Sequence, residues 1–306
     1  MRRALTGLLL ASITGAPWLR AGQQPPVRDA RRLRSGIELT TITATVADKE
    51  GHLVTGLPRD AFEIYEDGER QTITQFTDER VSVGLGVLLD ISDSMFGKRI
   101  RDARDAVDRF LVGLLSPDDE FLITAFNHKP RPLTTWTREP DVVRKALDSL
   151  TPSGGTAIYD AVVSAMPLVA RRERPRAAIV IISDGADTAS TATLRDVRSA
   201  LLRSDVFIYA IAIDSPEPQP INTRVNPQVL REITAESGGR TEIVKSSSDL
   251  EQATARIADE LNHQYVLGYT SSHGADGRFH SIRVRATNAD LRVRARNGYV
   301  AAGSSS

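Results

Sequence analysis

The sequence predicts an α/β fold: a doubly wound, Rossmann-like domain with a mostly parallel central sheet, inserted in a small β domain built from N- and C-terminal strands. Apolar strand patterns alternate with helical patterns through residues 81–262, which is typical of a parallel sheet covered by helices. Residues 36–80 and 263–301 instead show the period of two that marks half-buried strands. Each flanking segment is too short for a core of its own, so we expect the two to pair with each other.

The composition limits the function classes before any motif is considered. The chain has 306 residues, in which 39 Lys and Arg are balanced by 39 Asp and Glu. Proteins that bind nucleic acid or anionic membranes through their overall charge carry a basic excess, so we expect no nucleic-acid partner. The chain has no cysteine, which excludes disulfides, thiolate metal sites and cysteine nucleophiles.

Residues 1–21 have the pattern of an export signal. Arg2 and Arg3 form a basic start, residues 4–13 are apolar, and cleavage is expected after Ala21. A short membrane anchor or a disordered tail is the alternative, but the apolar run is well below the ~20 residues that span a bilayer. Residues 22–35 are polar and are interpreted as a linker. We therefore expect an exported protein, periplasmic or extracellular, whose mature chain has no transmembrane segment.

The first β segment, residues 36–80, is predicted to consist of short strands joined by turns. Its alternating apolar positions and turn residues predict strands over 37–46, 52–57, 62–65 and 71–76. Asp67 and Gly68 lie between the last two of these strands and predict a hairpin there.

The central segment, residues 81–262, alternates strands and helices. Apolar runs predict strands over 83–89, 120–126, 133–136, 177–182, 206–213 and 241–244, and helical spacing predicts helices over 98–115, 141–150, 158–169, 194–202, 227–236 and 248–262. Pro167 is expected to kink or shorten its helix. Residues 214–226 form a long polar loop after a strand, which is either a ligand-selecting loop or an exposed connector.

The last β segment, residues 263–301, returns to the period of two. Residues 265–269 predict a strand, residues 280–286 and 291–295 predict a hairpin, and residues 302–306 are expected to be disordered. Five arginines alternate along the predicted hairpin, and they form either a basic face for an anionic partner or the solvated outer face of the sheet: Arg283, Arg285, Arg292, Arg294 and Arg296.

Hard oxygen donors follow or precede three elements at the same predicted edge of the sheet. Asp90, Ser92 and Ser94 directly follow an apolar strand, Thr156 precedes a helix, and Asp184 ends another strand. In parallel sheets, ligands bind beyond the carboxyl ends of the strands. Two carboxylates and three hydroxyls suit Mg²⁺, which prefers oxygen ligands. Ordinary capping of the following helices is the alternative reading of the serines and aspartates.

These residues resemble the metal-ion-dependent adhesion site (MIDAS) of von Willebrand factor type A (VWA) domains. Residues 90–94 read Asp-Ile-Ser-Asp-Ser, residues 154–156 read Gly-Gly-Thr, and residues 183–185 read Ser-Asp-Gly, in the family's order and spacing. The flanks resemble an exported bacterial subgroup, with Gly-x-x-Val-x-Gly-Leu at 51–57 and Arg-x-Gly-Tyr at 296–299. The resemblance implies Mg²⁺ or Mn²⁺ held by Asp90, Ser92, Ser94, Thr156 and Asp184, with a carboxylate of a protein partner completing the coordination.

The leading functional hypothesis is an exported, divalent-metal-dependent protein-binding or adhesion module, not an enzyme. A metal-dependent phosphoester hydrolase is one alternative, but its usual second aspartate is replaced here by Ser92, which leaves that chemistry without an acid/base group. No metal loop contains a histidine, since the five histidines are at positions 52, 128, 263, 273 and 280. The other alternative is a structural envelope protein with a vestigial site.

Overall fold

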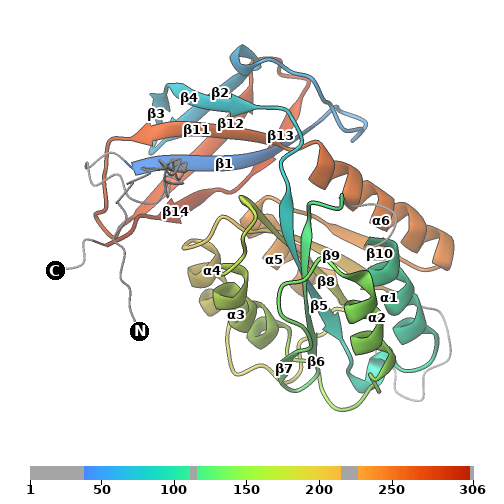
Figure 1. The fold of residues 1–306 in the computed structure, drawn as a ribbon. Helices are drawn as coiled ribbons and strands as arrows, with labels where there is room; N and C mark the ends of the chain where they lie inside the picture. The colour runs from blue at the N-terminus through green and yellow to red at the C-terminus, as the bar shows by residue number, and fades with distance from the viewer. Residues whose placement is uncertain (1–37, 111–115, 215–226, 304–306) are drawn as a thin grey trace, which may run out of the picture. The chain divides into compact units, whose positions relative to one another are not determined.

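The computed structural model describes residues 38–110, 116–214 and 227–303 (Figure 1). The expected export signal and linker lie outside the described residues, as do the end of the helix predicted over 98–115 and nearly all of the loop at 214–226. At the C-terminal end, Gly303 forms an isolated bridge with Asp276, and residues 304–306 lie outside the description. Among the described helices, none is long and apolar enough to cross a membrane.

A six-stranded sheet forms the centre of the α/β domain. Its strands, in spatial order, are β10 (Thr241–Val244), β9 (Phe207–Ile213), β8 (Arg176–Ser183), β5 (Val83–Asp90), β6 (Glu120–Phe126) and β7 (Pro130–Pro132). All neighbouring pairs are parallel except β6 and β7. Every residue of β5 is buried, as expected for a central strand covered on both faces.

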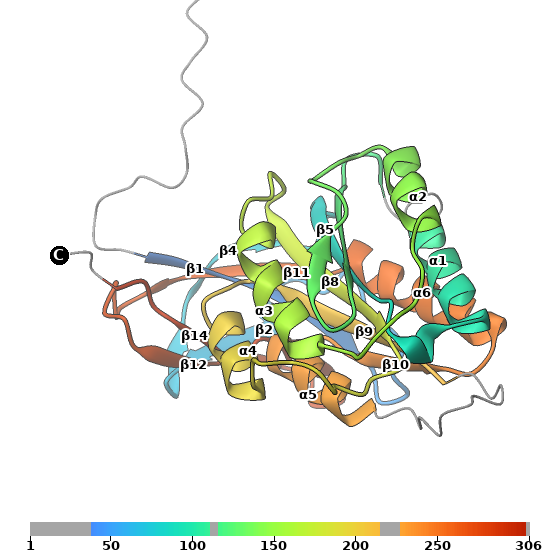
Figure 2. The same ribbon diagram turned by 90° about the horizontal axis from the view of Figure 1, so that it is seen from below.

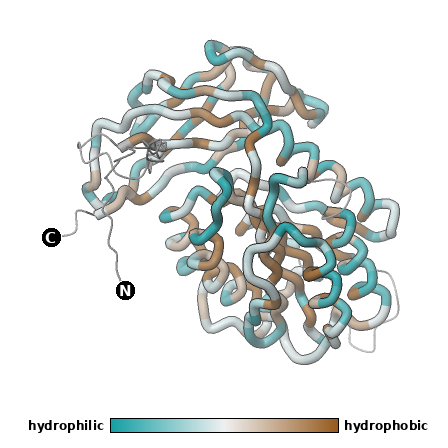
Figure 3. The backbone as a smooth tube through the Cα atoms, in the orientation of Figure 1, coloured by the Kyte–Doolittle hydropathy of each residue, from teal (hydrophilic) through white to brown (hydrophobic). Residues whose placement is uncertain are grey.

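Helices cover both faces of this sheet (Figure 2). The helices α1 (Lys98–Arg109), α2 (Pro140–Asp148) and α6 (Ser247–Asn262) share one hydrophobic cluster, and α3 (Ile158–Val169), α4 (Leu194–Leu201) and α5 (Pro227–Ser237) share another. Along β8, Val180 belongs to the first cluster and Ile179 and Ile181 to the second, because successive side chains of a strand point to opposite faces. The hydrophobic colouring in Figure 3 is concentrated in these central strands.

Two expectations for this domain concern the strand predicted over 133–136 and the effect of Pro167 on its helix. The strand predicted over 133–136 is wrong: β7 ends at Pro132, and the chain then continues along β6 through single hydrogen bonds. One cause is Thr134, whose hydroxyl accepts a hydrogen bond from the Ile123 amide and so replaces a ladder bond. Pro167 lies in the last turn of α3, which ends at Val169, so the missing amide interrupts only the end of the helix.

The remaining strands form two antiparallel four-stranded sheets. One has the order β13 (Arg292–Ala295), β1 (Glu38–Ala47), β11 (Tyr265–Ser271), β4 (Ile73–Thr77), and the other β14 (Gly298–Val300), β12 (Phe279–Ala286), β2 (Phe62–Glu66), β3 (Glu69–Gln71). Residues of both sheets share one core, which includes Ile42, Phe62 and Tyr265. Strands from the two ends of the described chain thus pair with each other, and the fold class predicted from the sequence is confirmed.

Two strand expectations in this region are wrong. Residues 52–57 form no strand, only an isolated bridge between Leu53 and Ala47. Residues 280–286 and 291–295 form no paired hairpin, because β12 pairs with β2 and β14 whereas β13 pairs with β1 in the other sheet. β14 pairs with Phe279–Ser281 of β12 and β2 pairs with Ile282–Ala286, and the chain crosses to the opposite sheet after Ala286.

The alternating arginines do not form one basic face. Arg283 and Arg285 are exposed on β12, whereas Arg294 lies on the other sheet and contacts the α/β domain, donating to Oε2 of Glu260 (2.6 Å) and to the Gly238 carbonyl (3.2 Å). Arg296 donates to the carbonyl of Thr41 at 2.9 Å. These last two side chains therefore hold backbone and side-chain oxygens in place, and the idea of a continuous anion-binding face is wrong.

The start of α6 offers a test of local stability. The Ser246 hydroxyl accepts a hydrogen bond from the Asp249 amide, and the Asp249 carboxylate accepts one from the Ser246 amide, which is a capping box. Ser246→Ala should lower the free energy of unfolding by about 1 kcal/mol. Urea denaturation measures this loss, and Ser149→Ala, at the exposed end of α2, should stay within about 0.5 kcal/mol of wild type. Equal stabilities of the two variants would contradict the role of the cap.

Candidate metal centre

Asp90, the last residue of β5, is fully buried at the carboxyl end of the central strand. Its Oδ1 accepts a hydrogen bond from the Ser92 amide (2.8 Å), and its Oδ2 accepts one from the Ser183 hydroxyl (2.6 Å). Burial, together with the nearby charge of Asp184, raises the pKa of Asp90 to about 7, although these hydrogen bonds oppose the shift. A buried carboxylate of this kind is stabilised in its charged form by a cation.

Ser94 lies in the short turn η2 (Asp93–Met95), and Ser92 is the residue directly before this turn. Their hydroxyl oxygens are 3.0 Å apart. Neighbouring oxygens around an octahedral Mg²⁺, with bonds of 2.0–2.1 Å, are about 2.9 Å apart. The two hydroxyls are therefore spaced as two ligands of one such ion would be.

Thr156 lies in a second loop, just before α3, and is 4% exposed. This loop is bound to the first, because the Ser153 amide donates to the Ile91 carbonyl (2.8 Å) and the Asp93 amide to the Gly154 carbonyl (2.9 Å). Gly154 has a φ of +78°, and a Cβ there would lie 3.2 Å from Nδ1 of His128. A histidine absent from the metal loops in sequence is thus beside one of them in space.

Asp184 follows β8 in a third loop and is 2% exposed. Its Oδ2 accepts a hydrogen bond from Nη1 of Arg99 (3.0 Å), and the same nitrogen donates to the Ser94 carbonyl (3.0 Å). Its Oδ1 is buried and, within the described part of the chain, has no hydrogen-bond partner. Leaving such an acceptor unsatisfied is costly, so a divalent cation at Oδ1 fits the residues present.

The structure thus brings the five predicted residues onto three loops at one edge of the sheet, and hydrogen bonds join the loops. Asp187, in the same loop as Asp184, accepts hydrogen bonds from the Tyr159 amide (3.1 Å) and the Ser190 hydroxyl (2.6 Å), so it caps α3. Sequence analysis missed Thr188, whose hydroxyl accepts from the Thr156 amide at 3.0 Å.

Two further contributors were also missed. Ser183 could have been found from its place beside Asp184 at the end of a strand. Arg99 carries no local signal, because it belongs to the charged face pattern of a helix and reaches Asp184 from 85 positions away in the sequence.

Part of the α/β domain matches a known protein family. Residues 85–186 match the family profile of the von Willebrand factor type A domain. No curated protein matches the sequence.

Solved structures share the fold at low sequence identity. An aerotolerance-related membrane protein from Bacteroides fragilis is 24% identical over 59% of this chain and 99% of its own, with a TM-score of 0.52. A von Willebrand factor type A protein from Catenulispora acidiphila is 13% identical over 89% of this chain and 76% of its own, also at 0.52. BatB from Bacteroides thetaiotaomicron is 21% identical over 58% of this chain and 98% of its own, at 0.50.

Proposed function

Because residues 85–186 match the von Willebrand factor type A domain, we propose that this chain is an exported protein-binding module that depends on a divalent metal ion. Asp90, Ser92, Ser94, Thr156 and Asp184 would hold Mg²⁺ or Mn²⁺, and a carboxylate of a protein partner would complete the coordination. The observation that carries the proposal is the buried, unpartnered Oδ1 of Asp184, in a loop joined to the Asp90 loop through the Ser183 hydroxyl.

The charges of the site favour an anionic ligand. The two carboxylates at this edge face one buried guanidinium, that of Arg99, which forms an ion pair with Asp184. Three of the five proposed ligands are neutral hydroxyls, so a bound divalent ion keeps enough positive charge to attract a carboxylate. The domain's own residues supply the fixed oxygens, and they leave no third carboxylate among them to occupy the partner's position.

Phe96 supports a binding surface beside the metal loops. It directly follows η2, two residues after Ser94, and its side chain is 64% exposed. Large exposed aromatic side chains are enriched at protein interfaces. We expect the partner to contact this ring while its carboxylate reaches the ion. The basic and apolar pattern of residues 1–21 supports delivery of the module outside the cytoplasm.

Thr156→Ala tests the metal site. It should weaken Mg²⁺ and Mn²⁺ binding by at least ~10-fold, the lower end of the loss seen when even an outer partner of a metal ligand is removed. Calorimetric titration of the full chain measures the affinity. The matched control is Ser164→Ala, which removes a hydroxyl that bonds only the Ala161 carbonyl within α3 and should bind metal as wild type does. Equal affinities in all three proteins would overturn the site assignment.

The partner chemistry needs a separate measurement. The protein is passed over two immobilised peptides that differ only in carrying aspartate or asparagine. Retention of the protein on the aspartate peptide in Mg²⁺, and its release by chelator, would support the proposal. Retention on both peptides, or retention that chelator leaves unchanged, would overturn it. Phe96→Ala should weaken retention without changing the Mg²⁺ affinity.

A further inference from the structure

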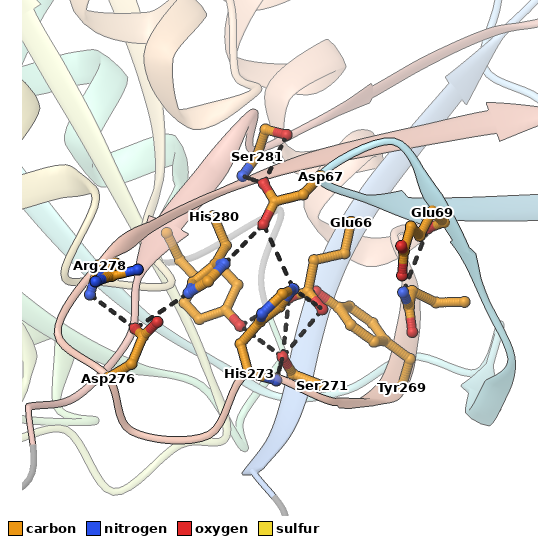
Figure 4. A network of polar contacts seen from close by, with 12 residues as sticks. Glu66, Asp67, Glu69, Tyr269, Ser271, His273, Asp276, Arg278, His280 and Ser281 are labelled. Atoms are coloured by element: carbon orange, nitrogen blue, oxygen red, sulfur yellow. Dashed lines mark hydrogen bonds and ion pairs between the residues drawn. The ribbon is translucent and has the colours of Figure 1, made fainter.

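A second group of possible metal ligands lies in the β sandwich, outside the α/β domain. Asp67 is at the turn between β2 and β3, His280 is on β12, and His273 is in the loop that joins β11 to β12 (Figure 4). One ligand atom from each of the three side chains lies within 4.8 Å of the others. Oδ2 of Asp67 is 2.8 Å from Nδ1 of His280 and 3.5 Å from Nε2 of His273.

The two imidazoles are stacked on each other. Their ring centroids are 4.3 Å apart with an angle of 21° between the planes. His280 is buried, whereas His273 and Asp67 are open to solvent, so a metal ion has a route to the cluster. In this arrangement one nitrogen of each ring and one oxygen of Asp67 point to a common region.

The opposite nitrogen of His280 is held by a carboxylate. Nε2 of His280 is 3.2 Å from Oδ1 of Asp276, and the Arg278 amide donates to the same oxygen at 2.8 Å. Nδ1 of His280 is within hydrogen-bond distance of Oδ2 of Asp67 (2.8 Å), so a metal ion bound at Nδ1 would replace the proton between these two atoms, while Asp276 continues to accept the Nε2 proton. Histidine ligands of metals commonly have this second hydrogen bond to a carboxylate, which fixes the tautomer and the ring orientation.

Glu66 adds a buried negative charge behind the cluster. It is fully buried, and its Oε1 accepts hydrogen bonds from the hydroxyls of Tyr269 (2.7 Å) and Tyr299 (2.8 Å). Its Oε2 accepts from the Ser271 hydroxyl (3.0 Å) and is 3.9 Å from Nε2 of His273. Three carboxylates therefore surround two imidazoles and stabilise positive charge there, whether a proton on His280 or a metal cation.

We propose that Asp67, His273 and His280 form a second metal site, selective for a Zn²⁺-type ion. Two imidazole nitrogens and one carboxylate oxygen are ligands that Zn²⁺ and its neighbours Co²⁺ and Ni²⁺ bind better than Mg²⁺ does. The fourth position is taken by water or by Oε2 of Glu66. The bound ion would tie the β2–β3 turn to the β11–β12 loop, two segments that are 213 positions apart at Asp67 and His280.

Co²⁺ titration of the full chain tests this site by visible absorption. Excess Mg²⁺ and the Thr156→Ala background keep Co²⁺ from the oxygen-only centre. We expect one equivalent to produce the intense bands of a four- or five-coordinate site with nitrogen ligands, and excess Zn²⁺ to abolish them. No band, or only the weak bands of an octahedral oxygen site, would overturn the proposal.

Variants locate the ion. His273→Ala, in a loop with 36% of that side chain exposed, should abolish the intense bands. The matched control is His263→Ala, because His263 is 48% exposed and also pairs with a carboxylate, that of Asp259, at 2.9 Å. It should leave the bands unchanged. Asp276→Asn should weaken Co²⁺ affinity ~10–100-fold and keep the spectrum, as expected for a positioning residue. Unchanged affinity in His273→Ala would show that the histidines and Asp67 form only a hydrogen-bonded cluster.

Discussion

Asp90→Asn is expected to make the metal-free protein more stable at pH 8 while abolishing its stabilisation by Mg²⁺. Asp90 is fully buried, and its pKa of about 7 in the folded chain lies above the usual value of 3.8. Between these values the unfolded chain binds fewer protons than the folded chain, so the free energy of unfolding falls as pH rises from about 4 to about 7 and is then flat. The shift corresponds to a loss of up to about 4 kcal/mol.

Asparagine removes this loss and keeps most of the contacts. Its side-chain oxygen can accept from the Ser92 amide, and its amide can donate to the Ser183 hydroxyl, so the two contacts of the carboxylate have replacements. The difference in stability between variant and wild type should therefore grow from pH 4 to pH 7. Urea denaturation in chelator across this range measures it, with the exposed Asp118→Asn as the control that should follow wild type.

Addition of Mg²⁺ should reverse the order of stability. A ligand present at 100 times its Kd stabilises the folded state by about 2.7 kcal/mol. Wild type should show this gain at pH 8 and a smaller gain at pH 5, where the metal ion has to displace the proton of Asp90. Asp90→Asn should show no gain at either pH. Two results would contradict this role of Asp90. One is an Asp90→Asn protein whose free energy of unfolding changes with pH as that of wild type does, and the other is an Asp90→Asn protein that Mg²⁺ stabilises as much as wild type.

Gly239→Ala is expected to destabilise the protein by about 3 kcal/mol or more. Gly239 lies between α5 and β10, and a Cβ at this position would be 1.8 Å from the carbonyl oxygen of Ile208 in β9. The contact is with backbone of a central strand, so relief requires moving β9 or the start of β10. Overpacking of a well-packed core costs up to about 3 kcal/mol and occasionally more. Chemical denaturation measures the change in the free energy of unfolding.

Gly303→Ala is the matched control for this substitution. A Cβ at Gly303 meets no atom within 4 Å. We therefore expect a change within about 0.5 kcal/mol of wild type, as for other surface substitutions. Equal free energies of unfolding for the Gly239→Ala and Gly303→Ala proteins would contradict this prediction, because they would mean that β9 or β10 can shift to accommodate the added Cβ at little cost.

The parts of the fold that the sequence predicted well are those set by local pattern. The buried strand that ends at Asp90 and the helix that begins after Thr156 follow directly from apolar runs and spacing. Which strands pair with each other does not follow from local pattern. The pattern of residues 280–286 and 291–295 predicted a hairpin, whereas β12 pairs mainly with β2 and β13 pairs with β1, two strands from the other end of the chain.

The candidate metal centre shows the same division. Its donors follow from short motifs, because consecutive residues at a strand end share an edge of the sheet. Arg99 and Thr188 were missed because each reaches the site across the fold. His273 and His280 were noted only as lying outside the metal loops, and their common neighbour Asp67 is in a segment from the other end of the chain. Gly239 follows the helix predicted over 227–236, and nothing in the local sequence indicates that it packs against the backbone of β9.

The position of β1 has a consequence for how the chain folds. This first described strand lies between β11 and β13, which are among the last strands of the chain. During synthesis or translocation β1 stays unpaired until residue 265 and its successors have emerged, and an unpaired strand edge promotes aggregation. The central domain has its contacts nearer in sequence and is expected to fold first, with the sandwich closing last, because pairing of high contact order is slow. A chain that stops before residue 265 would keep the central sheet but leave β1 without either neighbour.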